Sequence, residues 1–351
     1  MTGEAFLPRF LHILRGMENL KIYLIESPFQ DKVLLGRKVK EYVEREFEGA
    51  DVLYVQSVDE IAKAGTFAVI PLDCPLVSRA DVERAAKGLR LKGASCLKFE
   101  RSSAYVARGG GDGKTIFATS TAFFEISDAI SYYLVYNILK DRIVDRHLSN
   151  GVLIFDRATT FIDDTVEIGA GANILPFCRI EGGAVIEKCA TVSASYVLDS
   201  RIRARANVQY SHVVDSVIGE GATVGPFARL RGATIGKGCR IGDFVEVKKS
   251  VIGDGAKSAH LAYIGDATVG ERTNVGCGTV FCNYDGQNKH QTSVGSDCFL
   301  GANVNLVAPV AIGDNCFVAA GTTITQDLDD GTFAKGRAIT KTAVNQPKTD
   351  T

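Results

Sequence analysis

The most constraining feature of this chain is a six-residue spacing of aliphatic residues in its second half. They recur at Ile162, Ile168, Ile174, Ile180, Ile186 and Val192, and again at Val294, Leu300, Leu306, Ile312, Val318 and Ile324. Helices repeat near 3.6 residues and strands near 2, so a step of six fits neither a helical bundle nor an ordinary sheet. The spacing predicts hexapeptide repeats that wind a parallel β-helix, with one short strand on each of three faces per coil.

The six-residue spacing fails in one place, between Val280 and Val294. The gap contains the segment 282–290, with the sequence CNYDGQNKH. A β-helix does not need such a loop in order to stack its coils. An insertion there is therefore the first place in which to look for function.

Glycine usage divides the chain into two regions, because 25 of the 36 glycines lie after residue 150, at the corners that a triangular coil requires. Before that point, apolar runs alternate with helix-like stretches. The predicted strands are 21–25, 51–55, 66–71, 94–99 and 103–106; the predicted helices are 33–48, 79–88 (with Ser78 as N-cap) and 122–148, and 109–113 is predicted as a turn. We therefore expect an α/β domain at 1–150, a β-helix at 151–336 with nine or ten coils of about 18 residues, and a tail at 337–351.

Charge and hydropathy exclude several classes of partner. The formal net charge of −1 argues against nucleic acid or an anionic membrane surface as the main partner. No apolar run approaches the roughly 20 residues that span a bilayer, and the start of the chain has no signal-peptide pattern. These observations predict a cytoplasmic protein.

The nine cysteines form no Cys-x-x-Cys pair, so neither a disulfide framework nor a zinc site is predicted. Four of them lie two residues before an inward aliphatic position, namely Cys178, Cys239, Cys298 and Cys316. Since side chains alternate along a strand, these thiols should face the core, where small side chains pack well. We interpret them as packing residues in a reducing compartment.

Several charged side chains are predicted to share one outer face of the β-helix. Arg229, Glu246 and Tyr263 follow one another at a constant interval close to one coil, the same interval separates Arg231 from Lys248, and all five flank inward aliphatic residues. An interval of one coil stacks them on a single wall. Such a cluster suits an anionic, hydroxyl-rich ligand such as a sugar phosphate. The alternative is a solvated charged face, which any single pair of these residues would favour.

Two further residues are candidates for chemistry. His260 lies where the pattern is irregular, because Ser258 occupies a position that should be aliphatic. An imidazole with an ordinary pKa of about 6.5 suits a general base at neutral pH, although a lone histidine is more often a structural or surface residue. Cys277 lies between two glycines and is interpreted as a small residue, since a covalent acyl carrier would need a lowered thiol pKa.

Four segments carry a resemblance to a known family: 225–231 (GPFARLR), 244–249 (FVEVKK), 260–266 (HLAYIGD) and 282–286 (CNYDG). They resemble the acetyltransferase half of the bacterial bifunctional N-acetylglucosamine-1-phosphate uridyltransferase/glucosamine-1-phosphate N-acetyltransferase family. The resemblance runs from about residue 152 to residue 337. It implies a left-handed parallel β-helix, a homotrimer with active sites between subunits, and acetyl transfer from acetyl-CoA to the amine of glucosamine 1-phosphate.

The resemblance also implies roles for individual residues. His260 would be the general base, and Glu246 would orient or polarise it. The implied sugar-phosphate ligands are Arg231, Lys248, Tyr263, Asn274 and Lys289. The implied acetyl-CoA residues are Cys277, Asn283, Tyr284, Ala302, Ala320 and Arg337, with the backbone N–H of Cys277 beside the thioester carbonyl.

Some positions depart from the family pattern. Ala302 stands where the family commonly has serine, Asn303 replaces an acid, and Gly232 stands where proline is usual. We expect these changes to alter the affinity for CoA without abolishing it.

Residues 1–150 depart further from the family pattern than the β-helix does. The family's uridyltransferase half is longer, and its first strand leads into a glycine-rich turn that holds nucleotide phosphate. Here the first strand continues into the segment 26–31 (ESPFQD), which has no glycine. The segment 71–76 (PLDCPL) resembles the family's metal-binding aspartate motif, so Asp73 is a candidate Mg²⁺ ligand, but a lone acid in such a turn is more often structural. We therefore interpret residues 1–150 as a truncated nucleotidyltransferase-like domain without uridyltransferase activity, and we assign no metal ligand.

Three alternatives to this acetyltransferase remain. The same site can act on a different amino-sugar phosphate or use another acyl donor. The protein can be a catalytically inactive trimeric binding or regulatory paralogue, although the retained set of implied site residues opposes this. A fully bifunctional enzyme is opposed by the missing phosphate-binding turn.

Overall fold

The structure is a computed structural model that describes residues 20–109 and 113–336. The chain divides into two compact units between Ile143 and Val144. This division lies within helix α4 (Ala129–Ser149), so the domain boundary after residue 150 stays a prediction, and the predicted tail lies outside the described residues. No helix in the described ranges combines the length and the apolar character needed to cross a membrane.

The first unit contains a six-stranded sheet in the order β4-β1-β5-β7-β6-β8. Its strands are β1 (Leu20–Ile25), β4 (Val52–Val55), β5 (Thr66–Pro71), β6 (Cys96–Phe99), β7 (Tyr105–Arg108) and β8 (Thr115–Ala118). Strand β1 pairs in parallel with both β4 and β5, whereas β7 runs antiparallel to β5 and β6. Apolar side chains from the parallel strands pack with α2 and α3 in one buried cluster that includes Ile22, Leu24, Ile70, Val43 and Val82.

The helices of the first unit are α2 (Val39–Glu46), α3 (Arg79–Leu91) and the beginning of α4, with short 3₁₀ turns at Val58–Glu60 and Thr121–Phe123. The N-cap prediction at Ser78 is confirmed, because its hydroxyl accepts a hydrogen bond of 3.3 Å from the backbone N–H of Asp81.

Three element predictions in this unit were wrong. The helix predicted from residue 33 begins at Val39, because Val33–Leu34 (β2) and Arg37–Lys38 (β3) form a hairpin around a turn in which Leu35 and Gly36 have positive φ. The helix predicted from residue 122 begins at Ala129, where Asp128 accepts a hydrogen bond from the N–H of Ser131. Strand β8 was not predicted, and the strand predicted at 103–106 lies at 105–108.

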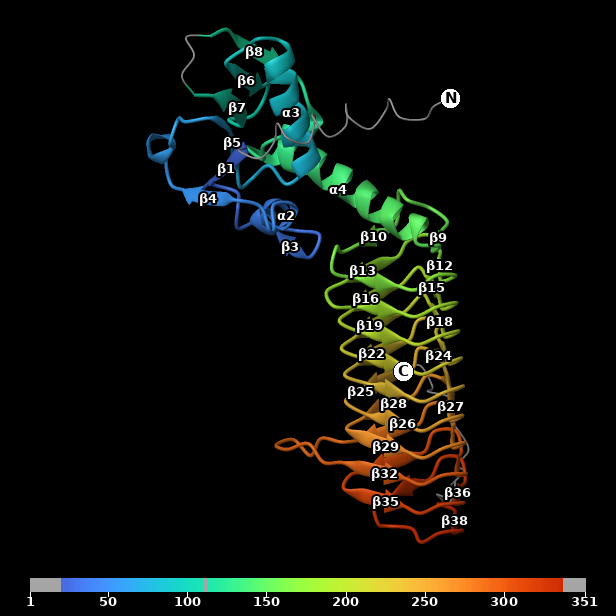
Figure 1. Cartoon of the computed structure of the whole chain (residues 1–351). Coiled ribbons are helices and arrows are strands. Elements are labelled where there is room, and N and C mark those ends of the chain that lie inside the picture. Colours follow the sequence, from blue (N-terminus) through green and yellow to red (C-terminus); the bar gives the residue numbers. More distant parts are fainter. Residues whose placement is uncertain (1–19, 110–112, 337–351) are drawn as a thin grey trace, which may run out of the picture. The chain divides into compact units, whose positions relative to one another are not determined.

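The second unit is the predicted three-faced parallel β-helix, which Figure 1 shows as a stack of successive coils. Face 1 consists of β10 (Phe161–Ile162), β13 (Arg179–Glu181), β16 (Tyr196–Leu198), β19 (His212–Val214), β22 (Arg229–Arg231), β25 (Glu246–Lys248), β28 (Tyr263–Gly265), β31 (Val280–Cys282), β34 (Asn305–Val307) and β37 (Thr323–Ile324). Face 2 consists of β11 (Glu167–Ile168), β14 (Val185–Ile186), β17 (Arg201–Ile202), β20 (Val217–Ile218), β23 (Thr234–Ile235), β26 (Val251–Ile252), β29 (Ala267–Val269), β32 (Thr292–Val294) and β35 (Val310–Ile312).

Face 3 consists of β9 (Leu153–Ile154), β12 (Asn173–Ile174), β15 (Thr191–Ser193), β18 (Asn207–Gln209), β21 (Thr223–Val224), β24 (Arg240–Asp243), β27 (Lys257–His260), β30 (Asn274–Val275), β33 (Phe299–Leu300), β36 (Phe317–Val318) and β38 (Phe333–Ala334). Coil length is close to the prediction. Phe161 pairs with Arg179, which is the predicted interval, whereas Tyr196 pairs with His212, so that coil is slightly shorter. The aliphatic residues of the six-residue pattern fill the interior.

The four cysteines predicted to face the core are buried. Their thiols donate to carbonyl oxygens of the following coil, as from Cys239 to Gly253 and from Cys298 to Gly313, both at 3.0 Å. Burial raises the pKa of Cys178, Cys239 and Cys298. All four cysteines are therefore packing residues, as the sequence predicted.

Candidate active site

The predicted stack on one outer wall is confirmed on face 1. Arg229, Glu246 and Tyr263 are direct partners in successive strands β22, β25 and β28, and Arg231 is the partner of Lys248. The inward neighbours Leu230, Val247 and Ile264 are fully buried, which fixes the alternation that turns the polar side chains outward. A rigid wall thus presents two arginines, a carboxylate, a lysine and a tyrosine.

The charged groups on this wall pair with one another. The Arg231 guanidinium binds the Glu246 carboxylate through Nη2, while its buried Nε has no hydrogen-bond partner among the described residues. One coil further, Lys248 Nζ lies 3.7 Å from Asp266 Oδ2, and both side chains are mostly buried. Arg231 and Lys248 therefore hold positive charge in fixed positions with donor capacity left for an anionic ligand.

The segment that breaks the six-residue pattern forms a turned-back loop between β31 and β32, and Figure 1 shows it projecting from the coils. Tyr284 and Lys289 form an antiparallel bridge, and Asp285 accepts hydrogen bonds of 2.7 Å from the N–H groups of Gln287 and Asn288. These backbone donors, together with His290 at 2.7 Å, hold the pKa of Asp285 well below its usual value. The loop is thus a preorganised element.

The loop returns two of its side chains to the face 1 wall. Asn283 Nδ2 donates to Asp266 Oδ2 at 2.5 Å and lies 3.5 Å from the Tyr263 hydroxyl. The neighbouring ammonium of Lys248 lowers the pKa of Lys289. Two ammonium groups this close repel each other, so a bound anion between them is favourable. The insertion therefore adds an amide and an ammonium group to the face 1 wall.

His260 lies at the corner between face 3 and face 1, at the end of β27. Its register partner is Asp243, and His260 Nδ1 lies 3.7 Å from Asp243 Oδ2, with both side chains largely exposed. The irregular residue Ser258 points inward and is buried, and its hydroxyl has no hydrogen-bond partner among the described residues. In the single chain the carboxylate beside His260 is thus Asp243, whereas Glu246 pairs with Arg231.

Three of the predicted acetyl-CoA residues occupy this same corner in successive coils. Continuing the register of β27 and β30 by two residues places Cys277 opposite His260. The next two coils extend this alignment. The N–H of Asn303 donates to the carbonyl of Cys277, and the N–H of Gly321 donates to the carbonyl of Ala302, both at 2.8 Å. One edge of the β-helix is therefore lined by His260, Cys277, Ala302 and Ala320, which we call the corner column.

The remaining predicted residues do not join these two groups within one chain. Asn274 lies on face 3, where its partners are Lys257 and Phe299, and the ring of Tyr284 is exposed on the loop. Arg337 lies outside the described residues. The structure adds two carboxylates that the sequence analysis did not name as candidates, Asp243 beside His260 and Asp266 beside Lys248. Both lie at corners, where the rule of alternating side chains does not apply, so the sequence pattern held no signal for them.

Comparisons with known proteins place the β-helix among transferases. The family described as "Bacterial transferase hexapeptide (six repeats)" matches residues 215–249, and "Hexapeptide repeat of succinyl-transferase" matches residues 291–326. The bifunctional protein GlmU of Caldanaerobacter subterraneus subsp. tengcongensis is 36% identical over 330 residues, which are 93% of this chain and 70% of the relative. GlmU of Clostridium beijerinckii is 48% identical over 231 residues, which are 64% of this chain and 51% of the relative.

GlmU of Staphylococcus haemolyticus is 46% identical over 220 residues, which are 62% of this chain and 49% of the relative. The chain therefore spans 70% of the length of the first relative and about half the length of the other two. Among solved structures, the UDP-N-acetylglucosamine acyltransferase of Arabidopsis matches with 16% identity and a TM-score of 0.29, covering 51% of this chain and 68% of the other. The corresponding enzyme of Francisella novicida matches with 13% identity and a TM-score of 0.27, covering 50% and 63%.

Proposed function

The chain belongs to the GlmU family of bifunctional proteins, and from that premise we propose that its β-helix transfers acetyl from acetyl-CoA to the amine of glucosamine 1-phosphate. The observation that carries this proposal is the cationic wall of face 1. Arg231, Lys248 and Lys289 gather there beside the hydroxyl of Tyr263 and the amide of Asn283. Cations with neighbouring neutral donors suit a phosphate attached to a sugar.

His260 is the proposed general base. The amine of an amino sugar is largely protonated at neutral pH, so a proton must leave before or during attack on the thioester carbonyl. The imidazole accepts that proton, the new C–N bond forms, and the thiolate of CoA leaves. Asp243, at 3.7 Å from Nδ1, stabilises the imidazolium that results.

The corner column supplies the proposed acetyl-CoA site. With Cys277 in the coil directly after His260, a thioester lying along the column brings its carbonyl next to the base. A backbone N–H, as proposed for Cys277, suits the developing oxyanion because it is already fixed in place before the reaction. Ala302 and Ala320 are small residues at the following corners, which leaves room for the pantetheine arm.

A trimer is part of the proposal. Beside the His260 corner runs an exposed apolar ridge, made of Tyr210, Phe227, Phe244 and Leu261, each more than half exposed. The rings of Phe227 and Phe244 stack with centroids 5.3 Å apart. Contiguous exposed apolar side chains mark association surfaces, and a neighbouring subunit placed there can supply Asn274 or Glu246 to the His260 corner.

For the first unit we propose that uridyltransferase activity is absent. Strand β1 is followed by the segment 26–31, which has no glycine and therefore offers no glycine-rich turn for nucleotide phosphate. The first backbone donors of this segment are also engaged within the chain. The N–H of Glu26 donates to the carbonyl of Val55 at 3.4 Å, and the N–H of Ser27 donates to Gln30 Oε1 at 3.2 Å. The activity proposed for this protein is thus acetyl transfer alone.

The test measures release of free CoA thiol from acetyl-CoA with glucosamine 1-phosphate, alongside release of pyrophosphate from UTP with N-acetylglucosamine 1-phosphate. We expect CoA release without pyrophosphate. His260→Ala should lower kcat by about 10²–10⁴-fold, the usual contribution of a general base, while the KM for acetyl-CoA stays within a few fold.

His212→Ala is the matched control, because His212 lies away from the corner column, on β19 of face 1, where it is the register partner of Arg229 and cannot act as the base at the His260 corner. It should retain full activity. Retention of activity by His260→Ala would refute the assigned base. Absence of CoA release from the wild-type protein with several amino-sugar phosphates would refute the proposed acetyl transfer.

A further inference from the structure

The outward side chains of face 1 form two parallel rows, and a glycine interrupts the second row next to the cationic wall. Glu246 and Tyr263 belong to the first row, as register partners in β25 and β28. Arg231, Lys248 and Gly265 are register partners in β22, β25 and β28, and they form the second row. The coil that carries Tyr263 therefore has no side chain at the position that carries a cation in each of the two preceding coils.

The ring of Tyr263 covers Gly265. A methyl group built on Gly265 would lie 2.5 Å from the Tyr263 hydroxyl oxygen and 2.7 and 2.8 Å from Cζ and Cε1 of the ring, whereas carbon atoms pack at about 3.5–4.0 Å. Gly265 is buried, although the alternation along β28 turns its position outward. The phenol thus extends from the first row across the strand into the second row.

The backbone does not require glycine at this position. Gly265 lies within strand β28 and is not among the residues with positive φ. Any residue adopts the extended conformation of a strand, and glycine weakens a strand because it has no side chain to pack. The atoms that a larger residue would meet first belong to the end of the Tyr263 side chain, which can rotate to another rotamer. Glycine at this position is therefore explained by the placement of the Tyr263 ring.

This placement brings the Tyr263 hydroxyl among the polar groups that the loop returns to the wall. The hydroxyl oxygen lies 3.5 Å from Asn283 Nδ2, and the same nitrogen donates to Asp266 Oδ2. Asp266 Oδ2 in turn lies 3.7 Å from Lys248 Nζ. A ring that stayed in the first row, opposite Glu246, would not bring its hydroxyl to this group of side chains.

We propose that Gly265 is a positioning residue for the sugar-phosphate ligand. By leaving the second row open, it lets Tyr263 place a neutral hydroxyl donor beside the ammonium groups of Lys248 and Lys289. Those cations attract the phosphate, and the hydroxyl, carried on a rigid ring, donates a hydrogen bond to one of its oxygens. This inference rests on the proposed function, because it takes a sugar phosphate as the ligand of the cationic wall.

Gly265→Ala tests this role in the full-length protein, because the added methyl group displaces the ring without removing any group of the site. A hydrogen bond to a charged group contributes about tenfold or more to binding, so kcat/KM for glucosamine 1-phosphate should fall about 10- to 100-fold. The loss should appear in the KM for glucosamine 1-phosphate, while the KM for acetyl-CoA stays within a few fold. Thermal unfolding at the wild-type temperature checks that the coil is intact.

A double variant separates positioning from a general structural role. Tyr263→Ala removes the ring, so Gly265→Ala in that background has nothing left to displace and should change kcat/KM by less than about twofold. A glycine needed only for the stability of the coil would cost the same activity in both backgrounds. Gly183→Ala is the matched control, because Gly183 also lies in the β-helix without positive φ, and a methyl group there would meet its nearest atom at 3.7 Å. It should bind and react as the wild type does.

Binding of glucosamine 1-phosphate without acetyl-CoA, measured by titration calorimetry, tests the proposal independently of turnover. We expect Gly265→Ala to bind about 10- to 100-fold more weakly than the wild type. Equal binding by the two proteins, including no binding by either, would overturn the proposal, and so would an equal loss caused by Gly265→Ala with and without the Tyr263 ring. Weaker binding by Gly265→Ala together with no CoA release from the wild type would refute the proposed acetyl transfer and leave the positioning role supported.

Discussion

A series of buried serines in the β-helix and the carboxyl end of β5 in the first unit treat their buried polar side chains in opposite ways. In the β-helix, Ser216 donates to the carbonyl of Val214 at 2.7 Å and accepts from the N–H of Ala233 at 3.0 Å; in the preceding coil, Ser200 accepts in the same way from the N–H of Ser216. In the first unit, Asp73 Oδ1 and the hydroxyl of Ser27 have no such partner among the described residues. The repeated register offers the hydroxyls of these serines a partner at a fixed place, so an unpaired atom marks a position shaped by something other than folding.

The largest predicted effect concerns Asp73. Its pKa is raised from 3.8 to about 7 in the folded state, so the unfolded state loses its proton first as the pH rises. The first unit should therefore lose stability between about pH 4 and pH 7, by up to roughly 4 kcal/mol, and Asp73→Asn should remove this dependence. Hydrogen-exchange protection of the β5 amides, corrected for the intrinsic rate, is the measurement. A flat profile in the wild-type protein would contradict the raised pKa.

His147 gives the opposite dependence in the second unit. It is 4% exposed, neither ring nitrogen has a partner among the described residues, and burial lowers its pKa from 6.5 to about 4, with Arg146 adding to the shift. The unfolded state then binds the proton first as the pH falls. Protection of the β9 and β12 amides should decrease from pH 6.5 to pH 4 by up to about 3 kcal/mol. His147→Gln should flatten this decrease, and an unchanged slope in that variant would assign it to other groups.

The regularity of the β-helix can be tested at Ser216. Replacing it with alanine leaves the buried N–H of Ala233 without its acceptor, which should cost about 1–3 kcal/mol. Thermal unfolding of the β-helix, followed through its far-ultraviolet signal, measures the loss. Equal stability of Ser216→Ala and wild type would show that the hydrogen bonds of these buried serine hydroxyls contribute little to the stability of the β-helix.

The same regularity explains how much the sequence could predict. Inward residues such as Leu230, Val247 and Ile264 repeat at a fixed interval, so the faces and the stacking of Arg229, Glu246 and Tyr263 followed from local spacing alone. Asp243 and Asp266 could not be found this way, because corner geometry depends on backbone turns and not on alternation. The proximity of Asp243 to His260 could therefore be identified only from the structure.

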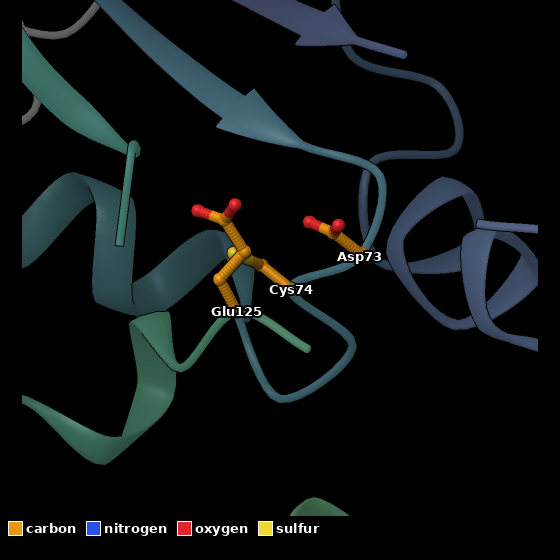
Figure 2. Close-up of side chains that lie close together, drawn as sticks. All are labelled: Asp73, Cys74 and Glu125. Atoms are coloured by element: carbon orange, nitrogen blue, oxygen red, sulfur yellow. The ribbon is translucent and has the colours of Figure 1, made fainter. Parts of the chain in front are cut away.

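The first unit was harder to predict, because its contacts are not local. Glu125 meets Asp73 through the hydrogen bond between Ile126 and Asp73, across a long stretch of chain that no periodicity relates. The hairpin of β2 and β3 replaced a predicted helical turn because Leu35 and Gly36 adopt positive φ, which helix-like spacing does not reveal. Sequence reasoning therefore singled out Asp73 but could not predict that Glu125 lies beside it (Figure 2).

The smallest predicted effect is at Ser258, one of several buried side chains of the β-helix that have an unpaired polar atom among the described residues. Its buried hydroxyl has no partner among the described residues, so Ser258→Ala removes an unpaired polar group and should leave stability unchanged or raise it by about 1 kcal/mol. Ser216→Ala, which removes a paired hydroxyl from the same kind of position, is its matched control. In contrast to Ser216→Ala, we expect Ser258→Ala to change the pH profile of acetyl transfer, because Ser258 lies two residues from His260 on the same strand. A loss of stability equal to that of Ser216→Ala, with an unchanged pH profile, would show that Ser258 has the same purely structural role as Ser216.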